Sequence, residues 1–185
     1  MKKYAFYIIA GFILFAVLSR LLPHAYNFTP IGAIALFGAA YFTRKMWAFL
    51  IPLAALWLSD LYLNNVVYSQ FYEGFTLITP GFLYLYGAFI LIVLLGFLLF
   101  DKITFPRVIG GALGASLIFF VISNFGVWIS SPMYPLTMEG LIMCYTAAIP
   151  FFHYTIAGDL LYCGVLFGGY EYLRYRVPEL GKVHV

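Results

Sequence analysis

The sequence predicts an all-α, polytopic integral membrane protein with about six transmembrane helices. Of its 185 residues, 64% are hydrophobic and 9% are charged, and the mean hydropathy is +0.98. A soluble domain carries about 25% charged residues. The apolar segments approach the roughly 20 residues that a spanning helix needs. Nine of the ten basic residues fall in alternate gaps between these segments.

The basic gaps predict the orientation of the chain. They are Lys2–Lys3, Arg44–Lys45, Lys102–Arg107 and Arg174–Lys182, and Arg20 alone falls elsewhere. Short loops rich in Lys and Arg stay on the cytoplasmic side of a membrane. We therefore expect both termini to be cytoplasmic, in the inner (cytoplasmic) membrane of a bacterium, with the other three loops outside.

The first half of the chain holds three expected spans, at residues 4–22, 31–43 and 46–63. Pro23 ends the first, and Pro30 stands where the second would begin. The second segment is short and could be re-entrant. A re-entrant segment would place Arg44 and Lys45 outside, against the charge pattern, so we count it as a span. Pro52 is tolerable inside the third membrane helix.

The second half holds the other three expected spans, at residues 81–100, 108–129 and 151–173. The longest polar connection, residues 64–80, precedes the fourth span. Residues 141–176 are too many for one span. We expect Pro150 to separate a short helix, residues 141–149, from the sixth span.

The length fits one membrane domain, residues 1–185, with no room for a second folded unit. The net charge of +3 needs no nucleic-acid partner, because the membrane orientation already accounts for the basic residues. Lys2–Lys3 and the apolar run after them could imitate a signal peptide. No small-residue cleavage site follows, and the apolar run resumes at Leu21.

Ionisable side chains inside a bilayer are costly, so each is a candidate for a functional role. Arg20 and Asp60 lie at nearly the same depth, close to the outer ends of the first and third spans, and we expect them to pair. The pair could be a structural lock between two helices, or one partner could meet a polar ligand. Asp159 lies deeper, in the sixth span.

Neutral polar groups are expected on the same outer side. Asn64 follows Asp60 by four residues, and Asn124 precedes Trp128 by four, so each pair shares a helix face. Amides and carboxylates framed by aromatic rings suit a ring-containing organic ligand. Aromatic residues also gather at membrane interfaces for anchoring alone.

Other function classes have little support in the sequence. The three histidines show no metal-ligand spacing, and no G-x-S-x-G is present, so we expect no enzyme, no cofactor and no metal. Cys144 and His153 leave an intramembrane enzyme as a minor alternative. A channel would need a ring or filter of polar groups, and a self-sufficient transporter would show two related halves.

Several motifs resemble an uncharacterised bacterial family, domain-of-unknown-function family 6580, whose members are described as candidate transport proteins. The resemblance covers nearly the whole chain. The two most specific blocks are Ser19-Arg20-Leu21-Leu22-Pro23-His24, with Asn27-Phe28-Thr29-Pro30 after it, and Ser123-Asn124-Phe125-Gly126-Val127-Trp128. Ser59-Asp60, Ile149-Pro150-Phe151-Phe152 and Gly158-Asp159-Leu160 add to it.

That family is similar in fold to the S-components of energy-coupling factor (ECF) transporters, six-helix proteins that capture vitamins at the outer face. The resemblance implies vitamin or micronutrient uptake, with a membrane transporter partner and a pair of ATPases. S-components use an AxxxA motif on the first helix for docking, whereas Ala35 and Ala39 lie on the second. A solitary binder is therefore an alternative, with Cys144 a weak candidate for ligating a cobalt-containing ligand.

The sequence thus predicts a membrane protein that binds a small organic nutrient, such as a vitamin, from outside. The alternative is a membrane scaffold similar to the cell-shape protein MreD, which transports nothing. The residues expected to line or organise the pocket are Arg20, Asp60, Asn64, Asn124, Trp128 and Asp159.

Overall fold

The computed structural model describes residues 3–22, 25, 27–79, 81–177 and 180. These residues form helices and connecting segments, without a β-strand. The helices are α1 (Lys3–Ser19), α2 (Ile31–Tyr41), α3 (Lys45–Tyr62), η1 (Leu63–Val67), η2 (Ser69–Phe71), α4 (Phe82–Leu99), α5 (Phe105–Ser130) and α6 (Met138–Arg176). The chain is therefore all-helical, as its composition predicts.

Within the described residues, four helical stretches are long and apolar enough to cross a membrane, which indicates a membrane protein. They are Lys45–Val67, Phe82–Leu99, Phe105–Ser130 and Met138–Arg176. Two apolar helices, Tyr4–Ser19 and Ile31–Tyr41, are shorter. The expected spans 46–63, 81–100 and 108–129 each agree with a helix to within a few residues.

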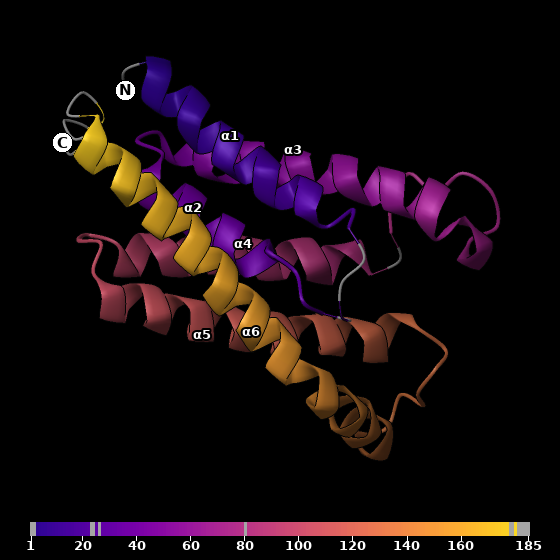
Figure 1. Ribbon diagram of the computed structural model, residues 1–185. Coiled ribbons are helices and arrows are strands. Elements are labelled where there is room, and N and C mark those ends of the chain that lie inside the picture. The colour runs from indigo at the N-terminus through magenta and orange to yellow at the C-terminus, as the bar shows by residue number, and fades with distance from the viewer. Residues whose placement is uncertain (1–2, 23–24, 26, 80, 178–179, 181–185) are drawn as a thin grey trace.

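The basic gaps of the sequence meet at one end of the bundle. The start of α1, the α2–α3 and α4–α5 connections and the end of α6 all lie at the left of Figure 1. We call this the basic end, after Arg44, Lys45, Lys102, Arg107, Arg174 and Arg176. The distal end holds η1, η2 and the segments before α4 and α6 (Figure 1). The segments that carry the basic residues alternate with other segments along the sequence, but in space they lie together at one end of the bundle.

Helix α2 is the centre of the bundle and covers residues 31–41 of the expected span 31–43. It has 11 residues, about 16 Å at 1.5 Å per residue, against a membrane core of about 30 Å. It packs against all five other α-helices. Every residue of α2 except Ala40 is buried. Burial inside protein favours the same apolar residues as burial in lipid, so the composition of α2 suits its central position.

Residues 27–30, which precede α2, are non-helical and pass from an exposed to a buried position. Asn27 adopts a left-handed conformation, with φ of 62°, and Pro30 precedes the first helical turn. A Cβ on Gly158 of α6 would lie 3.1 Å from the backbone N and O of Thr29. Because Gly158 has no side chain, Thr29 can lie directly against α6, and α2 begins deep in the bundle.

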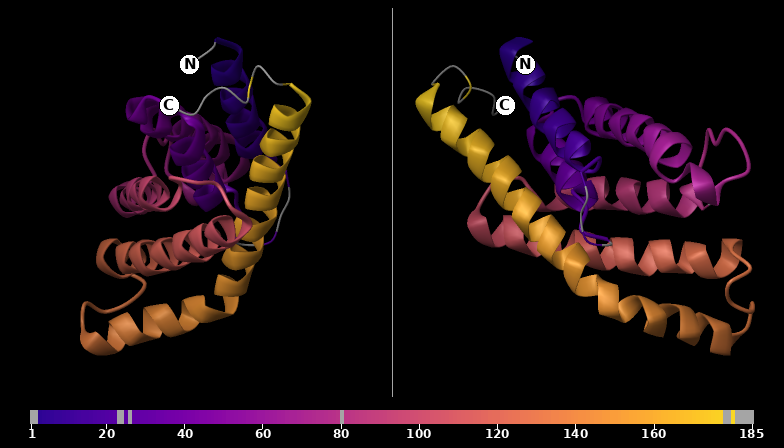
Figure 2. Two further views of the ribbon diagram at one scale, coloured as in Figure 1. Left: turned by 90° about the vertical axis from the view of Figure 1, so that its left-hand side faces the viewer. Right: turned by 45° about the vertical axis from the view of Figure 1, so that its right-hand side comes forward.

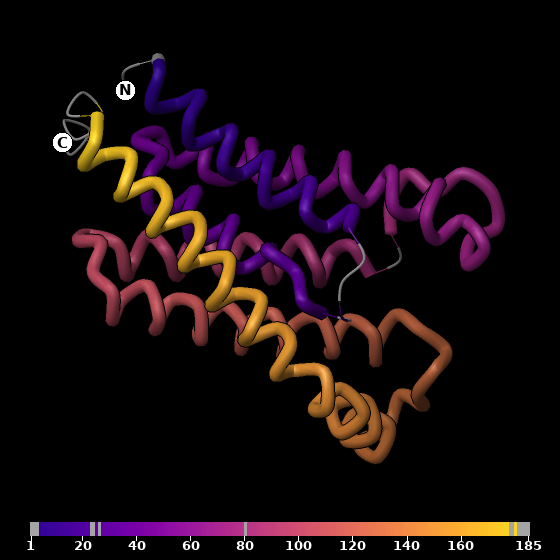
Figure 3. The backbone as a smooth tube through the Cα atoms, viewed as in Figure 1, coloured from indigo at the N-terminus to yellow at the C-terminus, as the bar shows by residue number. Residues whose placement is uncertain are grey.

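Helix α6 corrects the expected break at Pro150. It is one helix of 39 residues, with Pro150 about a third of the way along. Figures 2 and 3 show that the helix bends in its first third rather than ending there. Proline removes one backbone hydrogen bond and crowds the preceding turn, which bends a helix without breaking it when packing supports both sides.

Small residues let the central helices approach closely. A Cβ on Gly96 of α4 would lie 2.6 Å from the Cβ of Ala39, and Ala35 is fully buried. The Ala35–Ala39 motif is therefore part of the internal packing of α2 against α4.

Candidate functional site

The expected Arg20–Asp60 pair is present where α1 and α3 meet near the distal end. The Nη2 of Arg20 lies 2.7 Å from Oδ1 of Asp60, and its Nη1 donates to the hydroxyl of Ser59. The hydroxyl of Tyr86, on α4, donates to Oδ2 of Asp60 at 3.1 Å. Asp60 is 8% exposed. One carboxylate therefore ties together the end of α1, helix α3 and helix α4.

A cavity of about 200 Å³ opens beside Asp60. Three aromatic residues and Asp60 line one part of it, and the segment before α4 lines the rest. The lining residues are Trp57, Asp60, Leu77, Ile78, Thr79, Phe82 and Tyr86. Arg20 instead lines a separate, smaller space next to Asp60, together with the buried side chains of Ile31 and Phe89. Asp60 thus contacts Arg20 on one side and the cavity on the other.

The wall formed by residues 76–79 is held in place by side chains of α3 and η1. The indole Nε1 of Trp57 donates to the carbonyl of Leu77 at 3.2 Å, and Nδ2 of Asn64 donates to Oγ1 of Thr79 at 2.8 Å. Asn65 donates to the carbonyl of Thr76 at 2.8 Å and accepts from its N–H at 2.7 Å. Asn64, expected to line or organise the pocket, is not among the residues that line the cavity and instead positions its wall.

The π-helix η1 explains how two neighbouring asparagines reach this wall. Asn64 and Asn65 both lie in η1, a π-helical turn that follows α3 without a break. Such turns widen the helix and are frequent at functional sites. The structure thus adds Asn65, Thr79 and Tyr86 to the site. The sequence offered no signal for Tyr86, because its helix is uniformly apolar around it.

Asn124 and Trp128 do not join this cluster. They lie on α5, and among the described residues α5 has no contact with α3, because α4 lies between them. Nδ2 of Asn124 donates to the carbonyl of Phe120 in its own helix at 2.7 Å. Nε1 of Trp128 donates to the carbonyl of Pro135 at 3.0 Å. Trp128 thus holds the α5–α6 connection, whereas the side chain of Asn124 bonds within α5.

Asp159 forms a separate buried site at the start of α2. It is 2% exposed, and its Oδ2 accepts from the hydroxyl of Ser116 on α5 at 2.7 Å. The backbone N–H groups of Gly32 and Ala33 also donate to this carboxylate. A carboxylate at a helix N-terminus satisfies orphan donors and complements the helix dipole. Asp159 therefore acts as the N-terminal cap of α2, supplied by another helix.

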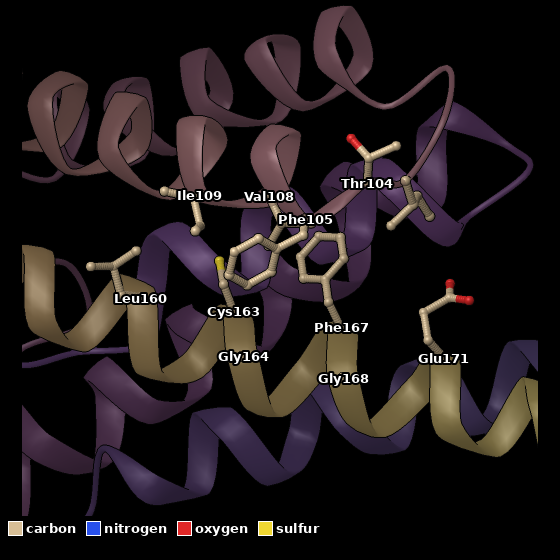
Figure 4. Close-up of a pocket in the computed structure, with 11 residues that line it drawn as sticks. Thr104, Phe105, Val108, Ile109, Leu160, Cys163, Gly164, Phe167, Gly168 and Glu171 are labelled. Atoms are coloured by element: carbon tan, nitrogen blue, oxygen red, sulfur yellow. The ribbon is translucent and has the colours of Figure 1, made fainter.

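A larger hollow of about 360 Å³ lies at the basic end, between α5 and α6 (Figure 4). Cys163 and Phe167 point from α6 toward the first turns of α5. The lining is apolar apart from Thr104, Cys163 and Glu171. The carboxylate of Glu171 already accepts from Tyr41 at 2.6 Å and pairs with Arg174 at 2.7 Å. The hollow therefore offers little to orient a polar ligand, and the cavity beside Asp60 is the better candidate.

The residues considered for an enzyme or metal site are arranged otherwise. The thiol of Cys144 donates to the backbone carbonyl of Asn124 at 3.4 Å, and the ring of His153 stacks on Tyr154. Within the described parts of the chain, no group of three or more His, Cys, Asp or Glu side chains could hold a metal ion. His24, part of the quoted motif, lies outside the described residues.

Comparison with known proteins identifies a family but no function. No curated protein and no solved structure matches the chain. The match to the family of unknown function DUF6580 covers residues 1–180. The chain therefore belongs to the family DUF6580.

Proposed function

We propose that this protein captures a small, ring-containing organic solute from the outer side of a bacterial cytoplasmic membrane, as a binding subunit for uptake. The binding site is the cavity beside Asp60. All six α-helices are inserted in the membrane, with α2 as a short central helix. Both termini face the cytoplasm.

The observation that carries this proposal is the position of Asp60. Its carboxylate is nearly buried and ion-paired on one side, yet it lines an open cavity on the other. Pockets that bind organic ligands are mostly apolar and aromatic, with a few polar groups that fix orientation. Trp57, Phe82 and Tyr86 supply the rings, and Asp60 and Thr79 supply the polar groups.

The charge distribution supports the proposed orientation. Every described Lys and Arg side chain outside Arg20 belongs to the basic end, and basic loops stay in the cytoplasm. The cavity beside Asp60 is built at the opposite end, from the last turns of α3, the segment before α4 and the first turns of α4. With this orientation the cavity faces the outside, where a nutrient is met first.

Two tryptophans provide a matched test of this site. Trp57 and Trp128 lie near the distal ends of α3 and α5, and each indole N–H donates to a backbone carbonyl, but Trp57 alone lines the cavity. Wild type, Trp57→Leu and Trp128→Leu are purified in detergent and screened for thermal shifts against small ring-containing vitamins and related heterocycles. A ligand that binds the folded state stabilises it by about 2.7 kcal/mol at a hundredfold excess over Kd.

The proposal expects one compound class to raise the melting temperature of wild type and Trp128→Leu but not of Trp57→Leu. Equal loss in both variants would place binding elsewhere. A screen without any shift, on protein that unfolds cooperatively, would contradict solute capture and favour the scaffold.

The scaffold remains the second candidate, because the Arg20–Asp60 cluster also has a purely structural reading. It joins α1, α3 and α4, and among the described residues no buried side-chain polar atom lacks a partner. A scaffold similar to MreD would need that rigidity and no ligand. Variants at Asp60 would then alter stability and partner binding without changing affinity for any solute.

Uptake by this chain would require a partner. One domain of 185 residues can bind a solute, but concentrating it across a membrane needs an energy source. We propose a membrane transporter subunit with ATPases in that role, as in the ECF systems that the family resembles. Co-purification from native membranes, with and without the bound solute, tests this step separately.

A further inference from the structure

We infer that the solute is a small planar cation or an N–H-rich ring, such as an amidine or an amino-substituted heterocycle. This inference rests on the proposed function and names the substrate class of the cavity beside Asp60. Three independent features of that cavity carry it: its hydrogen-bonding groups, the charge of the surrounding end, and its rings.

Two of the three side-chain donors described in the lining of the cavity are already engaged. The indole N–H of Trp57 donates to the carbonyl of Leu77, and the hydroxyl of Tyr86 donates to Asp60. Among the described lining side chains, the hydroxyl of Thr79 is the one donor left, because its oxygen accepts from Asn64. A ligand rich in acceptors would therefore find few side-chain partners.

The acceptors, by contrast, keep capacity for a ligand. An ionised carboxylate has about four lone-pair sites, and Asp60 uses one oxygen for Arg20 and the other for Tyr86. The carbonyl of Leu77 has a second lone pair beyond the one that Trp57 uses. A ligand with several N–H groups matches this set, and hydrogen bonds to a carboxylate are about twice as strong as neutral ones.

The charge of the distal end points the same way. Arg20 is the one Lys or Arg side chain described there, and it is ion-paired with Asp60. The other charged residues described at this end are the carboxylates Glu73 and Glu139, both exposed. The summed potential of such an end attracts cations and repels anions.

The aromatic lining suits a flat positive charge. Trp57, Phe82 and Tyr86 surround the carboxylate, and ring faces attract cations placed within about 6 Å. The volume of about 200 Å³ admits a single substituted ring and excludes large macrocycles such as cobalamin. The cavity therefore selects for a compact, planar donor.

Three nearly isosteric probes test the inference: benzamidine, benzamide and benzoate, which are cationic, neutral and anionic. Their affinities are measured by calorimetry on the full chain in lipid nanodiscs, with Trp57→Leu and Trp128→Leu as the matched pair that locates binding. We expect benzamidine to bind at least about tenfold more tightly than benzamide, about 1.4 kcal/mol, and benzoate to bind most weakly. Binding should be lost in Trp57→Leu and retained in Trp128→Leu.

Asp60→Asn tests the cause of the preference. It removes the carboxylate charge and leaves Arg20 unpaired, so the benzamidine preference should fall about tenfold and benzoate should gain. Should Asp60→Asn fail to fold, Tyr86→Phe tests the same carboxylate, with the opposite expected effect on the benzamidine preference. It keeps the ion pair and frees Oδ2 of Asp60, so the benzamidine preference should rise.

The outcomes separate this inference from the proposed function. Trp57-dependent binding in which benzamide or benzoate equals or exceeds benzamidine overturns the cation preference and leaves solute capture standing. So does Trp57-dependent binding of an anionic or neutral acceptor-rich compound from the wider panel, with no binding of benzamidine. Absence of any Trp57-dependent binding overturns both.

Discussion

Asp60 and Asp159 are both nearly buried carboxylates in the apolar bundle, yet their surroundings differ. Asp60 faces a guanidinium, a tyrosine hydroxyl and an open cavity. Asp159 receives a serine hydroxyl and two backbone N–H groups, and it lines none of the cavities described above. The first carboxylate retains capacity toward a ligand, whereas the second is enclosed and holds the start of a helix.

The difference shows that the cost of a buried charge can be met in two ways with separate consequences. A guanidinium neutralises the charge from one side, and the carboxylate still borders an open cavity, as at Asp60. Backbone donors at a helix N-terminus surround the charge and fix it, as at Asp159. An ionisable residue inside a membrane protein is thus a functional candidate, and its partners decide whether the function is binding or architecture.

The largest effect is expected where Asp159 meets α2. Gly32→Ala would place a Cβ 2.7 Å from Cγ of Asp159. Overpacking costs about 1–3 kcal/mol, and displaced hydrogen bonds to a charged group add about 1.5–3 kcal/mol each. We predict a loss of more than about 3 kcal/mol, measured as thermal unfolding in detergent.

The matched control is Gly11→Ala in α1, where an added Cβ meets nothing within 4 Å. It should change stability by less than about 1 kcal/mol. Equal effects at Gly11 and Gly32 would contradict the capping role of Asp159.

Breaking the ion pair is the next largest change. Arg20→Met leaves Asp60 without its guanidinium, and removing one partner of a buried pair costs about 3–5 kcal/mol. Because the pair borders the cavity, we predict the lower figure, about 3 kcal/mol. The Arg20→Met/Asp60→Leu double variant should recover part of this loss in thermal unfolding. A double variant that is destabilised by the sum of the two single changes would show that the residues are not coupled.

A smaller effect is expected when only one of the hydrogen-bond partners of Asp159 is removed. Ser116→Ala removes one hydrogen bond to the carboxylate and leaves the two backbone donors. Hydrogen bonds to charged groups contribute about 1.5–3 kcal/mol, so the free energy of unfolding should fall by about 2 kcal/mol. Ser123, whose hydroxyl donates within its own helix to the carbonyl of Phe119, gives the control Ser123→Ala. The Ser123 variant should stay close to wild type.

The smallest effect concerns the wall of the cavity. Asn65→Ala removes the two hydrogen bonds to Thr76 at a cost below about 2 kcal/mol, because the site is partly exposed. Hydrogen–deuterium exchange of residues 76–79 should nevertheless accelerate, and ligand affinity should fall with it. Ser69→Ala, at a weak 3.4 Å contact nearby, should leave exchange unchanged. Unaltered exchange in Asn65→Ala would mean that the wall is held by other contacts.

The sequence predicts the helical class, the basic end and the Arg20–Asp60 pair because these depend on simple physical rules. Basic loops stay on the cytoplasmic side of a membrane. Charges embedded in the bilayer are costly, so two opposite charges at equal depth are expected to form an ion pair. Helix α3 also follows from the sequence, since Trp57 and Asp60 share a helical face and both reach the cavity.

Other features depend on which helices are neighbours, and a single sequence does not carry that information. Asn124 and Trp128 share the depth of Asp60, but α4 separates α5 from α3. Tyr86 is one tyrosine in an apolar helix until that helix is placed against Asp60.

The most direct test of the account is which side of the membrane the cavity faces. Leu77→Cys at its wall and Lys102→Cys at the basic end are built in a background in which Cys144 and Cys163, both buried, are replaced by alanine. Intact cells are treated with a membrane-impermeant maleimide. We predict labelling of Leu77→Cys and not of Lys102→Cys. Labelling of Lys102→Cys alone would show that the protein has the opposite orientation in the membrane, and would contradict solute capture from outside.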